Sequence, residues 1–156
     1  MAVTSVIAEP MNVNIQREAK PRIAVVDDPI FDEHHARMPH PERPERLAAA
    51  RRAVARFAEE GATIVRPAAR DATEDEIARA HSAEYAEQVA SLAGKQTMLD
   101  ADTFIAPHSV AAARRAAGAA VVLVDTILSE NEGDPRTGVA LLRPPGHHAT
   151  RNRGMG

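Results

Sequence analysis

The sequence predicts an α/β fold with a parallel sheet that helices cover on both faces. Short apolar runs alternate with longer stretches of helical periodicity, which is the pattern of parallel α/β proteins. The run at 138–142 is continuously apolar, as expected of a central strand. The stretch AAVVLVDTIL at 119–128 is apolar nearly all round, so we expect this part of a helix to be buried on more than one side.

The chain is expected to begin with a loose leader at residues 1–21, followed by one domain at 22–156. The leader is aperiodic and contains Pro10 and Pro21. RIAVVDD then predicts a short buried strand at 22–27. The next stretch, PIFDEHHARMPHPERP, is rich in proline and polar side chains, which indicates a long surface loop.

A helix is predicted at 44–61, where the sequence is PERLAAARRAVARFAEEG. Leu47, Val54 and Phe57 share one face of that helix, which is the face expected to meet the core. Gly61 supplies a stop signal, because glycine readily adopts the left-handed conformation that ends many helices.

A second strand is predicted at 62–66, before two short helices. Thr73 and Glu76 have the spacing of a capping box, in which each side chain satisfies the other residue's backbone N–H. Ser82 is placed to cap the next helix, which we expect to run to about Leu92.

The longest predicted helix spans 107–129 and has Gly118 at its middle. Glycine inside a helix costs about 1 kcal/mol relative to alanine. Close approach of a neighbouring segment would explain that cost, so we expect another element to touch the helix there.

Composition excludes several classes of function. Aromatic residues make up 3% of the 156 residues and the net charge is −3, so a nucleic-acid surface or an anionic membrane is not an expected partner. The chain has no cysteine, which excludes disulfides and thiolate metal sites. No apolar run is long enough to span a bilayer, and no signal peptide is evident. We therefore expect a cytoplasmic protein; no feature indicates its oligomeric state.

The most informative motif is RPPGHHA at 143–149, directly after the last predicted strand. In parallel sheets, sites form beyond the carboxyl ends of the strands. Adjacent side chains on an extended segment point in opposite directions, but a turn stiffened by Pro144 and Pro145 would let His147 and His148 face one cavity. Such a pair suits proton transfer. The alternative is one hydrogen-bonded core histidine beside one surface histidine.

Two other polar groups are weaker candidates. DEHH at 32–35, with His40 nearby, has the ligand types for a divalent cation, but its spacing matches no defined site, which favours a solvated loop. Asp100 and Asp102 precede the longest helix. Both are ordinary loop residues, or one of them places a carboxylate at the rim of a site. That carboxylate would accept N–H bonds from a substrate.

Five segments together resemble the histone deacetylase family, in the branch that contains class II and bacterial enzymes and acetylpolyamine amidohydrolases. The most specific of them is the RPPGHHA motif. The resemblance covers most of the chain from about residue 23 onward. The segments, in order, are HPERPERL (40–47), AHSAEY (80–85), DADTF (100–104), LLRPPGHHA (141–149) and GMG (154–156).

The resemblance implies a three-layer arginase–deacetylase fold and hydrolysis of the amide of an acetylated lysine or an acetylated polyamine. It also implies a zinc ion that polarises the acyl carbonyl and acidifies a bound water. By the match, His148 would act as general base and then acid, with His147 as its electrostatic partner. Asp102 would grip the substrate backbone at the rim, and Gly156 would contribute to the substrate site.

Arg46 would resemble an arginine near a channel for the released acid; otherwise it is a helix-surface partner for Glu42, four residues earlier. The family's metal ligands lie downstream of GHHA, and the sequence stops at Gly156. The expectation is therefore an incomplete, amino-terminal portion of a deacetylase that binds no zinc by itself and is inactive alone. The alternative is a noncatalytic remnant or partner-binding fragment.

Overall fold

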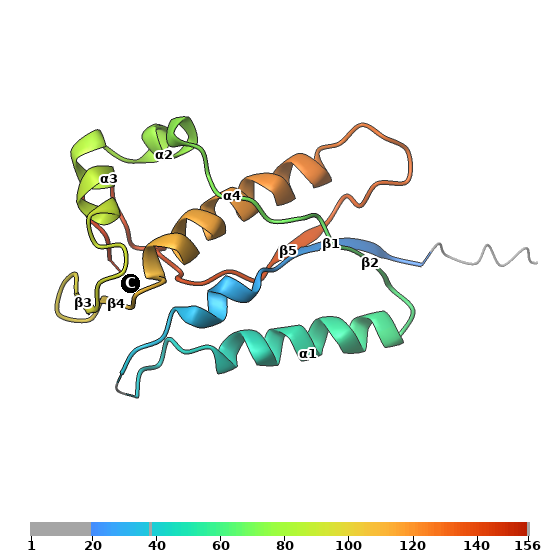
Figure 1. Ribbon diagram of the computed structural model, residues 1–156. Helices are drawn as coiled ribbons and strands as arrows, with labels where there is room; N and C mark the ends of the chain where they lie inside the picture. Colours follow the sequence, from blue (N-terminus) through green and yellow to red (C-terminus); the bar gives the residue numbers. More distant parts are fainter. Residues whose placement is uncertain (1–19, 38, 156) are drawn as a thin grey trace, which may run out of the picture.

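A computed structural model describes residues 20–37 and 39–155 and contains a three-stranded parallel sheet (Figure 1). The prediction that the three apolar runs share one parallel sheet is confirmed: Ala24 aligns with Val65 on one side and with Gly138 on the other. The strands, in spatial order, are β2 (Thr63–Val65), β1 (Arg22–Val26) and β5 (Gly138–Ala140).

The position of β5 corrects one expectation. In the part of the chain that the structure describes, β1 is the middle strand and β5 lies at an edge, so β5 does not have the expected central position there. An apolar run reports burial of both faces, not pairing of both edges. Val139 is 40% exposed, so even the burial of β5 is incomplete.

Two helices cover the sheet, one on each face, so the three-layer arrangement is confirmed. In Figure 1, α1 (Glu45–Glu59) lies below the strands and α4 (Ser109–Ile127) above them. Gly61 adopts φ +105° just after α1, and its N–H donates to the carbonyl of Ala58, as expected of a helix stop. Phe57, expected on the core face of α1, is 37% exposed.

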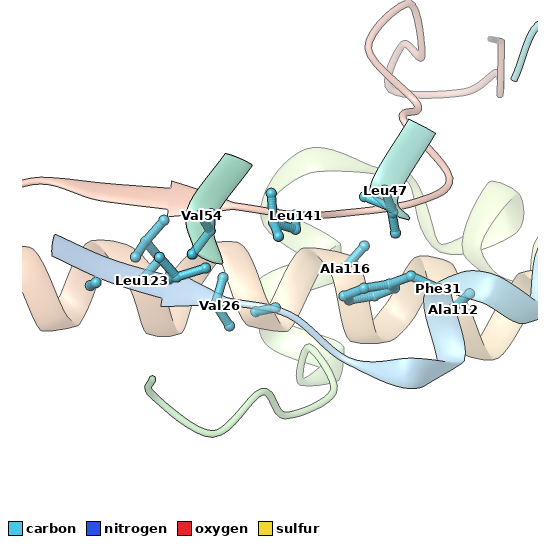
Figure 2. Close-up of a cluster of buried hydrophobic side chains, with 11 residues drawn as sticks. Val26, Phe31, Leu47, Val54, Ala112, Ala116, Leu123 and Leu141 are labelled. Carbon is cyan, nitrogen blue, oxygen red and sulfur yellow. The ribbon is translucent and has the colours of Figure 1, made fainter. Parts of the chain in front are cut away.

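The core joins both helices to the middle strand (Figure 2). Phe31, on the short helix η1 (Pro29–Glu33) that follows β1, is fully buried beneath α4. Burying a side chain of this size contributes roughly 2–3 kcal/mol. The buried cluster is Ala24, Val25, Val26, Phe31, Leu47, Val54, Ala112, Ala116, Ala119, Leu123 and Leu141.

Gly118 is confirmed as a point of close approach. A Cβ atom at this position would lie 2.2 Å from the carbonyl oxygen of Arg70 and 2.5 Å from the backbone nitrogen of Ala72. The amide of Ala72 donates to the carbonyl of Arg114 on α4 at 2.9 Å. The segment before the second pair of helices therefore crosses α4 backbone to backbone, which explains the glycine inside the helix.

The short elements gather at one end of the sheet. The two helices there are α2 (Glu74–Ala80) and α3 (Ala83–Ala90), and their predicted caps at Thr73 and Ser82 are both present. The carboxyl ends of the parallel strands point toward this end, where the chain also finishes (Figure 1). This end also contains an antiparallel pair of short strands, β3 (Thr97–Met98) and β4 (Phe104–Ile105).

Candidate functional site

The two histidines of the RPPGHHA segment lie on a turn after β5, beyond the carboxyl end of the sheet. The ring centroids of His147 and His148 are 3.9 Å apart, with the ring planes tilted by 47°. Gly146 has φ +57°, and its carbonyl accepts the N–H of Ala149 at 3.0 Å, which closes the turn. The turn brings both rings together, and both side chains are exposed.

A cavity of about 440 Å³ opens next to this turn. Its walls come from α3, from α4 and from the segments around β4 and after β5, and they are mostly apolar. Gly146 and Ala149, which flank the histidines, line the cavity, whereas His147 and His148 are not among its lining residues. Asp102 lines the same cavity.

Asp100 and Asp102 have different environments. The Asp100 carboxylate accepts N–H bonds from Asp102 at 3.1 Å and Thr103 at 2.8 Å, and these bonds hold the loop. Hydrogen bonds from Thr103, then from Asp102, keep the pKa of the Asp100 carboxyl below its ordinary value. The Asp102 side chain is exposed at the cavity. Asp100 is thus a loop residue, and Asp102 is the carboxylate with access to a bound molecule.

The expectation of a solvated DEHH loop is wrong for His34, which is 4% exposed. Its ring stacks on Phe104 with centroids 4.3 Å apart, and its Nδ1 lies 2.7 Å from Ser109 Oγ. Ser109 Oγ also accepts the N–H of Ala106 at 2.7 Å, so this hydroxyl joins the His34 ring to the start of α4. The other ring nitrogen, His34 Nε2, lies 3.7 Å from Glu42 Oε2.

Burial is the largest influence on His34 and lowers the pKa of its imidazole to about 4. The carboxylate of Glu42 acts in the opposite direction, while the guanidinium of Arg143 lowers the pKa further. His34 is therefore neutral at pH 7. With the His34 ring neutral, the cation that pairs with the Glu42 carboxylate is Arg143.

Arg143 and Glu42 form a buried ion pair that the sequence analysis missed. Arg143 Nε and Nη2 donate to the two carboxylate oxygens of Glu42 at 2.6 and 2.5 Å, and Nη1 donates to the carbonyl of Phe31 at 2.8 Å. A signal was present, because an arginine at the end of an apolar strand needs a buried acceptor. Arg46 is exposed on the first turn of α1, and the carboxylate that its position suggested as a partner is taken by Arg143.

Zinc does not fit the residues described here. Within residues 20–37 and 39–155, no three His, Asp or Glu side chains are grouped to hold a metal ion. His34 is turned into the core, which separates it from the exposed His35 next to it. Gly156 and most of the predicted leader lie outside the described residues. No helix in the described part of the chain has the length and apolarity to cross a membrane.

Comparison with known proteins gives relatives along most of the chain. The polyamine deacetylase HDAC10 of Homo sapiens is 39% identical over 120 residues, which cover 70% of this chain and 17% of that protein. An uncharacterized protein of Synechocystis, slr0245, is 37% identical over 139 residues, covering 86% of this chain and 44% of its own. The chain thus spans less than half the length of these curated relatives.

A solved structure agrees with the fold. The HD domain of HDA15 superposes with a TM-score of 0.72 at 29% identity, covering 88% of this chain and 40% of the HDA15 chain. The model of the histone deacetylase domain family matches residues 40–156, which contain the buried ion pair, the Asp102 loop and the histidine turn. The fold is therefore that of a histone deacetylase domain, and the chain belongs to the histone deacetylase family.

Proposed function

We propose that this chain supplies the histidine pair and one wall of the substrate site of a deacetylase that hydrolyses acetylated lysine or an acetylated polyamine. The observation that carries this proposal is the contact between the rings of His147 and His148, whose centroids are 3.9 Å apart. Both rings lie on a turn beyond the carboxyl end of the sheet. Imidazole is the side chain most often used for general acid–base catalysis, so two of them side by side suit a proton-transfer role. Family membership supports the reaction type, and the polyamine deacetylase among the relatives supports the second substrate class.

Each histidine has a separate task in this proposal. His148 takes a proton from the water that adds to the acyl carbonyl, and returns it to the amine nitrogen as the C–N bond breaks. His147 tunes the charge of its neighbour. The complete domain would use zinc to polarise the carbonyl, with ligands from outside the described residues; no ligand is assigned within them.

Three further residues complete the proposed substrate site. The exposed carboxylate of Asp102, at the cavity, accepts N–H bonds from the substrate. Gly156 is proposed to contact the substrate, and Arg46 to lie near the exit of the released acid; for these two residues the support is the family resemblance. The chain by itself is proposed to be inactive, and the cytoplasmic location stays a prediction.

A chimera tests the proposal directly. The segment of the HDA15 HD domain that matches this chain is replaced by residues 20–155, and turnover is measured on an acetyl-lysine peptide and on an acetylated polyamine. Activity that disappears when both His147 and His148 are changed to Ala supports the proposal. A folded chimera with full zinc content and no turnover would contradict it.

A partner-binding role without catalysis is the second candidate. Val124 on α4 and Leu128, which directly follows α4, are 48% and 70% exposed, and Val139 on the edge strand is 40% exposed. Apolar side chains in such positions suit contact with another protein surface. Size-exclusion chromatography with light scattering checks the simplest form of this role, self-association, and a strictly monomeric chain at high concentration argues against that form.

A further inference from the structure

The buried ion pair of Glu42 and Arg143 adjoins the proposed catalytic turn, because Arg143 is bonded directly to Pro144. We infer that this pair is a positioning device: it holds the start of the turn and thereby sets where the rings of His147 and His148 lie. The inference rests on the proposed function for the importance of that ring geometry. Neither residue touches the histidine rings, so both would be positioning residues rather than catalytic ones.

The ion pair of Glu42 and Arg143 is a rigid anchor for the start of the turn. The side chains of Arg143 and Glu42 are 3% and 11% exposed. Three N–H donors of the guanidinium are used, two on Glu42 and one on the carbonyl of Phe31. Phe31 is fully buried in the main core. A planar guanidinium that binds a carboxylate through two nitrogens is fixed in orientation as well as in position. A lysine ammonium, which acts as a point charge, would not fix the orientation.

The anchor itself is braced from the other side. The N–H of Glu42 donates to His40 Nδ1 at 3.1 Å, and the ring of His40 meets Phe104 edge-on. Phe104 stacks on His34, which is bonded to Ser109 at the start of α4. The carboxylate of Glu42 is therefore set by contacts that reach β4 and α4.

A short, stiff segment connects the ion pair to the two histidines. Pro144 and Pro145 have restricted backbone angles, and the N–H of Ala149 closes the turn on Gly146. Only three residues separate Arg143 from His147. A displacement of Arg143 would therefore also displace the two rings, because the segment between them is short and stiff.

The far end of the turn is held independently. His81 Nδ1 donates to the carbonyl of Thr150 at 3.0 Å, and the N–H of Ser82 donates to the carbonyl of Arg151 at 3.0 Å. Both of these donors come from the junction of α2 and α3. The histidine turn is a span between two fixed points, and the Arg143 end is the one that is buried and charged.

The experiment uses the chain itself and needs no substrate, so it distinguishes failure of this inference from failure of the proposed function. Arg143→Lys keeps the positive charge but loses the fork. Amide exchange of Ala149 and the cross-ring nuclear Overhauser effect between His147 and His148 are measured by NMR. We expect Ala149 to exchange at least about tenfold faster and the cross-ring signal to weaken, while the core amides Ala119 and Leu123 stay within about twofold.

Two further variants complete the design. Arg51→Lys is the matched control, because Arg51 also binds a carboxylate with two nitrogens, at 2.7 and 2.9 Å on Asp27, but has no bond to the turn; it should leave Ala149 unchanged. The double variant Glu42→Leu/Arg143→Met replaces the pair by apolar groups, which often preserves stability, and should loosen the turn as Arg143→Lys does.

Two results would overturn the inference. In one, Ala149 exchange and the cross-ring signal are unchanged in Arg143→Lys, or in the double variant. In the other, the core amides lose protection by the same factor as Ala149, up to complete unfolding. The pair would then support the whole chain and not the histidine turn.

Discussion

The chain contains two His-His dipeptides, and they differ in the burial of their rings. In the first, His34 is buried against Phe104 while His35 is exposed. In the second, His147 and His148 are both exposed with their rings in contact. His34 has extended backbone angles, φ −85° and ψ 95°, whereas the second pair lies in a hydrogen-bonded turn.

The difference shows that backbone conformation decides what a histidine pair can do. An extended segment sends neighbouring side chains to opposite sides, so one ring of the first pair enters the core and becomes a neutral structural group. The turn at 147–148 brings the two neighbouring rings into contact and leaves both exposed. Identical dipeptides therefore have a structural role at 34–35 and a proposed catalytic role at 147–148.

The largest effect is expected from His148→Ala in the active chimera. Loss of a general base and acid should reduce turnover on acetyl-lysine by at least ~10² while zinc content stays constant. His147→Ala should reduce turnover less, because it removes only the electrostatic partner. Steady-state kinetics with metal analysis of each variant decides the matter, and near-normal turnover by a zinc-loaded, folded His148→Ala would refute the assignment.

The first dipeptide should show its asymmetry in stability. His34→Ala removes a buried ring and the hydrogen-bond partner of the Ser109 hydroxyl, so we expect a loss of about 2–4 kcal/mol in the free energy of unfolding. His35→Ala changes an exposed side chain and should cost less than about 0.5 kcal/mol. Urea denaturation of both variants gives the comparison; equal losses would mean that the two rings are not differently buried.

The pKa of His34 predicts a pH dependence of stability. Folding lowers that pKa from 6.5 to about 4, so between these values the unfolded chain binds a proton that the folded chain excludes. Stability from this source is complete above pH 6.5 and falls by up to about 3 kcal/mol as the pH drops to 4. The groups that face the ring, Glu42, Arg143, His35 and His40, modify this amount.

The measurement is urea denaturation at several pH values in this window. In His34→Gln the free energy of unfolding should change less between pH 6.5 and 4 than it does in the unmodified chain. His35→Gln should keep the full pH dependence. A pH dependence that His34→Gln leaves intact would show that His34 is not the group responsible.

The smallest effect is expected for zinc. An inward His34 leaves DEHH without a paired-imidazole site, so calorimetric titration of the chain at neutral pH should detect weak binding or none. A stoichiometric site of submicromolar affinity would contradict this prediction. His35→Ala and His147→Ala would then show which dipeptide binds the ion.

Local patterns in the sequence were sufficient for much of the fold. The capping box at Thr73, the Ser82 cap and the stop at Gly61 depend on neighbours within a few residues, so their spacing predicts them correctly. The three parallel strands follow from apolar runs that alternate with helices. Gly118 in the helix also predicted a close contact. Its partner, the backbone at 70–72, was not identifiable from the sequence.

The candidate site shows where sequence reasoning ends. RPPGHHA identified the proposed catalytic turn, because proline, glycine and histidine carry their conformational and chemical properties with them. The burial of His34 and the pairing of Glu42 with Arg143, 101 residues apart, were not predictable, because they depend on which distant segments the fold brings together. Strand order is a long-range property for the same reason: apolarity reports that a face is covered, and only the tertiary structure decides which strand lies at each edge.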